Sequence, residues 1–121
     1  MGQEYFLEPR VPLNKIELEI TINWLLSVPD AVIHTNDYTT WYLFRDDSER
    51  KRRIQWWKEN PTKNDYLTSY FVLSTEGIQL SLVEDDVDII AWKLAKWWLN
   101  LFGGRLLDCG IEISPQDLLP N

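Results

Sequence analysis

The chain has 121 residues, a length typical of one domain, and we expect a single domain over residues 1–121. Its composition, 45% hydrophobic and 26% charged, excludes a disordered or collagen-like chain. The 19 acidic and 12 basic residues give a net charge of −7, which disfavours general binding to nucleic acid or to membrane surfaces, because both attract positive charge.

The N-terminal segment, residues 1–14, is predicted to be an irregular lead-in that lacks the basic start and the apolar run of a signal peptide. Apolar runs such as Ile89–Trp92 are far shorter than the ~20 residues of a membrane span. The single cysteine, Cys109, cannot form an intrachain disulfide. We therefore expect a cytoplasmic protein that does not enter a membrane.

Two strands are predicted in the first half of the chain. From Lys15 to Ile22, apolar and polar residues alternate, which is the pattern of a half-buried strand. The stretch Thr39–Phe44 is rich in β-branched and aromatic residues, which favour a second strand. Between these strands Pro29 prevents a long helix, and residues 23–30 are expected to form a short helix or a turn.

The segment 46–59 is compatible with two structures. Asp46 followed by Glu49 three residues later is typical of a capping box, and Asn60–Pro61 would end a helix that starts there. The alternative is a hairpin whose return strand is Arg53–Trp57. We favour the helix and keep the hairpin as the alternative.

In the second half of the chain, residues 60–68 are predicted to form a loop, followed by a hairpin that turns about Gly77, which can adopt positive φ. The longest helix is expected to start after an N-cap at Asp85 and to end at Gly103–Gly104. Three strands are predicted in this half, at Ser69–Ser74, Ile78–Val83 and Arg105–Ile113.

This order of elements predicts an α+β fold, in which a mainly antiparallel sheet carries the long C-terminal helix on one face. A ferredoxin-like split βαβ arrangement is one way to close such a fold.

The long helix carries more apolar residues than one buried stripe needs. A flank that includes Trp92 and Leu99 either packs inside the protein or forms a surface for a partner or for a second copy of the chain. We keep both alternatives and expect a monomer or a weak homodimer. The core stripe at helical spacing comprises Val87, Ile90, Ala91, Leu94, Trp98 and Leu101.

Tryptophan and basic side chains occur together in residues 45–63. The chain has seven Trp, and the adjacent pair Trp56–Trp57 points in two directions on a helix or a strand, so at least one ring should be partly exposed. Seven of the 12 basic residues lie in the same segment. Exposed Trp and Arg are typical of protein-binding surfaces, and their combination also resembles a surface for single-stranded nucleic acid. The candidate partner-binding residues are Trp56, Trp57, Trp92, Leu99, Arg52 and Arg53.

No residue pattern typical of catalysis, metal binding or cofactor binding occurs in the chain. His34 is the only histidine, which excludes a zinc site with several histidines. A catalytic couple of Cys109 and His34 has no local support, because Cys109 is expected to be a buried residue of a strand. We predict no enzymatic activity, no cofactor and no metal. A small-molecule binder with a Trp-lined pocket between the sheet and the long helix stays an alternative.

The segment Asp88–Leu99, followed by Gly103–Gly104 and Arg105–Asp108, resembles the C-terminal part of small bacterial immunity proteins of polymorphic or contact-dependent toxin systems. The similar element is an alanine-containing amphipathic helix, a Gly-Gly stop and then a strand with an aspartate. The resemblance implies a non-enzymatic inhibitor that neutralises a toxin by direct binding, and it assigns no functional residue. An acidic chain would be steered toward a basic toxin domain, because opposite net charges accelerate encounter.

Overall fold

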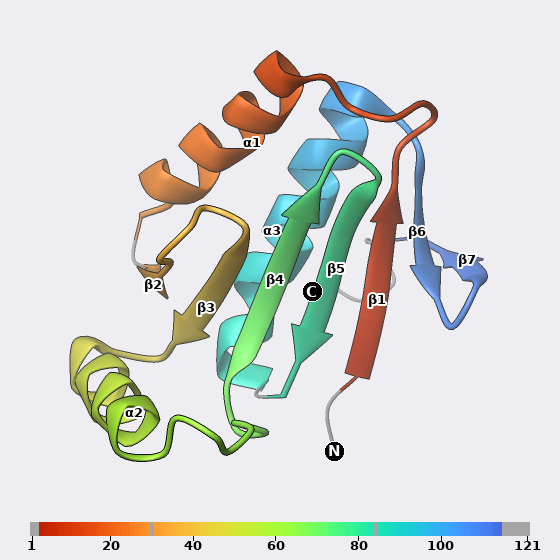
Figure 1. Cartoon of the computed structure of the whole chain (residues 1–121). Helices are drawn as coiled ribbons and strands as arrows, with labels where there is room; N and C mark the ends of the chain where they lie inside the picture. The colour runs from red at the N-terminus through yellow and green to blue at the C-terminus, as the bar shows by residue number, and fades with distance from the viewer. Residues whose placement is uncertain (1–2, 30, 84, 115–121) are drawn as a thin grey trace.

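Seven strands and three helices form an α+β fold in the computed structural model, which describes residues 3–29, 31–83 and 85–114 (Figure 1). The helices are α1 (Lys15–Ser27), α2 (Asp47–Glu59) and α3 (Asp85–Phe102). The strands are β1 (Gln3–Glu8), β2 (Val32–His34), β3 (Thr40–Phe44), β4 (Ser69–Ser74), β5 (Gly77–Leu82), β6 (Arg105–Asp108) and β7 (Ile111–Ile113). They form one sheet in the order β2-β3-β4-β5-β1-β6-β7, with antiparallel neighbours. The predicted α+β class and mainly antiparallel sheet are confirmed.

Two helices cover one face of the sheet. Figure 1 shows α3 behind β4 and β5, and α1 packs beside α3, where Trp24 stacks on Trp97 with 5.0 Å between the ring centroids. The core between these helices and the sheet contains the fully buried rings of Trp41, Phe71 and Trp98. The remaining helix, α2, contacts β2 and β3. Within the described ranges, none of the helices combines the length and apolar character that a membrane span requires.

The irregular lead-in predicted over residues 1–14 is correct for residues 9–14 and wrong for residues 3–8, while residues 1–2 lie outside the described ranges. Gln3–Glu8 forms β1, which lies inside the sheet between β5 and β6. Tyr5 and Leu7 are buried in the core, while Phe6 is only partly buried. Buried and partly buried residues alternate only over residues 5–8, which is too short a pattern to predict a strand. The strand is stabilised by backbone hydrogen bonds to β5 on one side and β6 on the other.

The predicted strand over Lys15–Ile22 is also wrong, because these residues begin α1. Asn14 caps the helix: its side chain accepts a hydrogen bond from the Glu17 N–H at 2.8 Å, and its own N–H donates to the Glu17 carboxylate at 3.0 Å. Wound into a helix, the alternating residues separate onto two sides. Ile16 and Ile20 are 68% and 40% exposed, so the pattern that suggested a strand includes exposed isoleucines.

Several predictions based on local signals are confirmed. The second predicted strand is β3, residues 60–68 form a loop, and the β4–β5 hairpin has positive φ at Gly77. The segment 46–59 is a helix and not a hairpin, since the Asp46 side chain accepts a hydrogen bond from the Glu49 N–H at 2.7 Å and caps α2. At its C-terminal end α3 stops before the two glycines as expected, but it begins at Asp85 rather than after it.

The single strand predicted over Arg105–Ile113 is instead a hairpin of β6 and β7. Cys109 and Gly110 form the turn with φ of +50° and +83°, and positive φ at both positions is the geometry of a tight hairpin turn. Cys109 is therefore exposed and not a buried strand residue. His34 lies on β2 at the opposite edge of the sheet, so the two side chains cannot form a catalytic couple.

Candidate binding groove on the open face of the sheet

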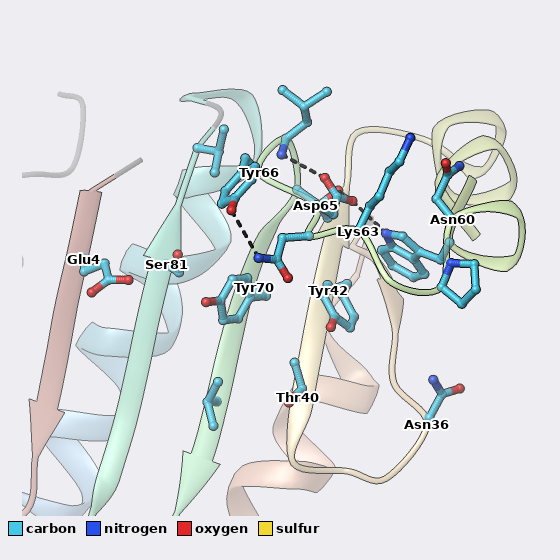
Figure 2. Close-up of a pocket in the computed structure, with 17 residues that line it drawn as sticks. Glu4, Asn36, Thr40, Tyr42, Asn60, Lys63, Asp65, Tyr66, Tyr70 and Ser81 are labelled. Atoms are coloured by element: carbon cyan, nitrogen blue, oxygen red, sulfur yellow. Dashed lines mark hydrogen bonds between the residues drawn. The ribbon is translucent and has the colours of Figure 1, made fainter. Parts of the chain in front are cut away.

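The register of the sheet places four polar or aromatic side chains in one row. Tyr42 on β3 lies opposite Tyr70 on β4, and Tyr70 lies opposite Ser81 on β5. Ser81 in turn lies opposite Glu4 on β1. Because side chains alternate along a strand, and their neighbours in sequence point into the core, these four point away from α3. The row forms the floor of a groove (Figure 2).

The loop 60–68 forms one wall of the groove, and Trp57 of α2 lines the end next to Tyr42. The groove is open to solvent on one side, and its volume is about 1170 Å³. Tyr66 and Leu67 on this loop are 75% and 62% exposed. The side-chain amide of Asn64 donates a hydrogen bond to the Tyr66 hydroxyl at 3.1 Å, which orients the ring (Figure 2). An exposed aromatic and aliphatic pair beside a groove is typical of a contact surface.

Asp65 fixes this wall to α2. Its carboxylate accepts hydrogen bonds from Trp57 Nε1 at 2.7 Å and from Thr68 Oγ1 at 2.7 Å. The Leu67 N–H donates a third hydrogen bond at 2.8 Å, and Arg53 Nη2 forms an ion pair with Oδ1 at 2.6 Å. The Asp65 side chain is only 9% exposed, so these contacts are shielded from water. The loop is therefore held in place by a buried charge rather than by its own apolar residues.

The contacts of Asp65 set its pKa. Burial alone would raise this pKa, but the hydrogen-bond donors around the carboxylate, Arg53 first among them, outweigh burial and lower the pKa from 3.8 to about 2. The folded protein thus stabilises the charged form of Asp65.

We expect acid to destabilise the protein through Asp65. In the unfolded chain the Asp65 carboxyl has the ordinary pKa of 3.8, whereas in the folded protein its pKa is about 2. The contribution of the charged Asp65 to the stability of the fold is therefore complete above pH 3.8 and is lost as the pH falls toward about 2. Asp65→Asn should lower the free energy of unfolding at pH 7 by about 1–2 kcal/mol and flatten its decline between the two pKa values. Urea unfolding across this pH range measures both effects. Parallel pH profiles for wild type and variant would contradict the assignment, and Asp47→Asn, on the exposed side of α2, is the control.

Trp57 connects the groove to the aromatic residues of β2 and β3. Its ring centroid lies 4.6 Å from that of Tyr42, 6.0 Å from that of His34 and 6.1 Å from that of Phe44. Burial raises the pKa of the Tyr42 phenol, and neighbouring ionisable groups raise it further. Tyr42 therefore keeps its proton at neutral pH and can donate a hydrogen bond to a ligand.

Four of the predicted partner-binding residues lie on α2, where only Trp57 lines the groove. The Arg53 guanidinium lies 5.0 Å from the centroid of the Trp56 ring and pairs with Asp65, and neither Arg53 nor Trp56 lines the groove. Arg52 is exposed outside the groove lining. Three other basic residues of the segment, Arg45, Arg50 and Lys51, pair with acidic residues of the same segment.

Of the other two predicted residues, Trp92 belongs to the core and Leu99 packs against it. Trp92 is 7% exposed and meets Tyr5 edge-to-face at 5.0 Å, and Leu99 is partly buried against the core cluster. Of the two alternatives for the α3 flank, burial within the protein is therefore the one observed for Trp92. The core stripe is confirmed in its centre, but Leu101 is 53% exposed.

Sequence reasoning missed Tyr42, Tyr70, Tyr66 and Glu4 as members of one site. A signal for the first two was present, because the predicted strands place Tyr42 and Tyr70 on the faces opposite Trp41 and Phe71. Nothing in the sequence indicated that these faces lie side by side, since that depends on the β3–β4 and β4–β5 registers.

Over the described ranges, no group of three or more histidine, cysteine, aspartate or glutamate side chains is arranged to hold a metal ion. Comparisons with protein-family models, with curated proteins and with solved structures find no match to the chain. The groove is therefore interpreted from its own geometry.

Proposed function

We propose that the chain is a protein-binding protein without catalytic activity, whose partner docks in this groove. The observation that carries the proposal is the lining, in which Tyr42, Tyr66, Tyr70 and Trp57 are interspersed with asparagine, serine and threonine side chains. Tyrosine and tryptophan offer large contact areas at low cost in conformational entropy, and the small polar side chains offer adaptable hydrogen bonds. The same combination is typical of the binding loops of antibodies.

Two other functions have less support. The predicted small-molecule site is a Trp-lined pocket between the sheet and the long helix, whereas the groove lies on the opposite face of the sheet and is open to solvent. For nucleic acid, the basic segment 45–63 would have to supply free cations, but Arg45, Arg50, Lys51 and Arg53 form ion pairs within the protein. The net charge of −7 would also repel phosphate.

We further propose that the partner is inhibited by this binding, as a toxin is by an immunity protein, and that the chain acts in the cytoplasm as a monomer or weak homodimer. The net charge of −7 supports a basic partner, because opposite charges accelerate encounter. The burial of Trp92 supports the monomer, since it removes the largest apolar side chain of the α3 flank from the surface.

We infer in addition that the fold is an elaborated ferredoxin-like arrangement. The spatial order β6-β1-β5-β4, with α1 between β1 and β4 in sequence and α3 between β5 and β6, supports this inference. In this description β2, β3 and α2 are an insertion before β4. The inserted segment and the loop that follows it contribute Tyr42, Trp57 and Asp65 to the groove, so this part of the chain would form one side of the groove.

The test is site-specific photo-crosslinking in the source cells. A photoreactive phenylalanine analogue replaces Tyr66 in one variant and Ile111 in the control, since these side chains are 75% and 69% exposed and Ile111 lies outside the groove. We expect a discrete protein adduct from position 66 only, lost when Leu67→Glu is added. Identical adducts from both positions, or nucleic acid as the sole adduct, would refute protein binding in the groove.

A further inference from the structure

We propose that the groove takes an arginine or lysine side chain from an extended segment of the partner, with the cationic group between the Tyr70 ring and the Glu4 carboxylate. This proposal rests on the proposed function and specifies the chemistry of the partner. It follows from the single charged side chain of the row Tyr42, Tyr70, Ser81 and Glu4, which is Glu4 at the β1 end.

Glu4 differs from the acidic residues near it. Asp65 is paired with Arg53, and Glu8, on the same strand as Glu4, pairs with Arg105 at 2.7 Å. Glu4 is exposed, lines the groove and forms no ion pair within the described part of the chain. A carboxylate on a binding surface whose charge is not already compensated is a site for a cation of the partner.

The floor beside Glu4 suits the same ligand. The hydroxyl groups of Tyr42 and Tyr70 have no hydrogen-bond partner over the described ranges, and Figure 2 shows the Tyr70 hydroxyl directed toward the side of the groove where Ser81 and Glu4 lie. Tyrosine rings attract a cation to their faces, and the hydroxyl oxygen can accept a hydrogen bond from it. A guanidinium group could use the ring, the hydroxyl and the carboxylate together.

The groove also has a polarity that orients the segment. Lys63 lies on the loop 60–68 that forms the wall, whereas Glu4 lies on the opposite side of the groove, on β1 (Figure 2). Strands lie about 4.8 Å apart, so the three steps from Tyr42 to Glu4 span about 14 Å, or roughly four residues of an extended segment. Lys63 repels a cation at one side and Glu4 attracts it at the other, so the basic side chain is expected over β5 and β1.

Titration followed by amide NMR on the full chain tests the proposal. The probe is a capped heptapeptide in which glycine alternates with arginine, and a glutamate version of the same peptide is the negative probe. We expect the arginine peptide to shift the amide signals of Tyr70, Ser81 and Glu4, and Glu4→Gln to raise its dissociation constant about tenfold. The control, Glu76→Gln, removes the same charge from the β4–β5 turn and should change the constant less than about twofold.

The outcomes separate this proposal from the proposed function. Shifts outside the groove, or equal effects of Glu4→Gln and Glu76→Gln, would overturn the cation site even if Tyr66 still crosslinks to a protein. Specific shifts in the groove without any protein crosslink at position 66 would support the cation site and overturn protein binding. Loss of the shifts in Tyr70→Leu, with the fold intact by circular dichroism, would support the role of the ring, and unchanged binding would contradict it.

Discussion

Trp92→Asp is expected to unfold the chain. The Trp92 side chain is 7% exposed and meets Tyr5 edge-to-face at 5.0 Å. Removing a buried tryptophan costs about 3–5 kcal/mol, and an unpaired carboxylate in its place adds a desolvation cost of several kcal/mol more. The sum is comparable with the whole stability of a small domain, about 5–15 kcal/mol. Far-ultraviolet circular dichroism and urea unfolding measure the outcome.

The matched control is Lys93→Asp, at the next position of α3, where the side chain is exposed. This variant should keep the fold and lose less than about 1 kcal/mol. A folded Trp92→Asp protein with an altered sedimentation coefficient would contradict the burial of Trp92. It would revive the alternative in which the α3 flank is a surface for a second copy of the chain.

Gly104→Ala is expected to produce the second large loss of stability. Gly104 has a φ of +102°, and a Cβ atom there would lie 2.1 Å from the carbonyl oxygen of Glu8 and 3.0 Å from Pro9 Cα. Both contacts are with backbone at the end of β1, so no side chain can move aside. The added methyl would force β6 away from β1, and we expect a cost of at least about 3 kcal/mol in urea unfolding.

Gly110→Ala separates the effect of backbone conformation from that of the steric contact. Gly110 also has positive φ, +83°, but no atom lies within 4 Å of a Cβ built there. Its substitution should cost only the conformational penalty of about 1–2 kcal/mol. Equal losses for the two variants would show that the close approach of Gly104 to β1 is not what destabilises the protein.

The elements that the sequence predicted are those with strong local signals. The Asp46 cap predicted α2, and the two glycines predicted the end of α3. In contrast, β1 depends on partners that follow far along the chain, and no local pattern marked it. The strand predicted over Lys15–Ile22 failed because period-two alternation can also occur in a capped helix with exposed isoleucines.

The groove shows the same limit. Its tryptophan, Trp57, is predicted as a contact residue because of its type and because at least one ring of the adjacent pair Trp56–Trp57 is expected to be partly exposed. Glu4 could not be predicted, because it joins the site only through the pairing of β1 with β5. The ion pair between Arg53 and Asp65 could not be predicted either, because Asp65 lies on a loop whose conformation does not follow from residue propensities. Residue type predicted Trp57 as a contact residue, and the strand register determines which side chains lie in the same row.

The affinity of the crosslinked partner for two matched variants tests the central claim most directly. Leu67→Glu and Ile111→Glu each place one carboxylate at an exposed apolar position, the first on the groove wall and the second on β7. If the groove is the binding site, isothermal titration calorimetry should give a loss of about 100-fold for Leu67→Glu and less than about twofold for Ile111→Glu. Wild-type affinity for Leu67→Glu, together with a large loss for Ile111→Glu, would place the binding site on the opposite edge of the sheet and contradict the account.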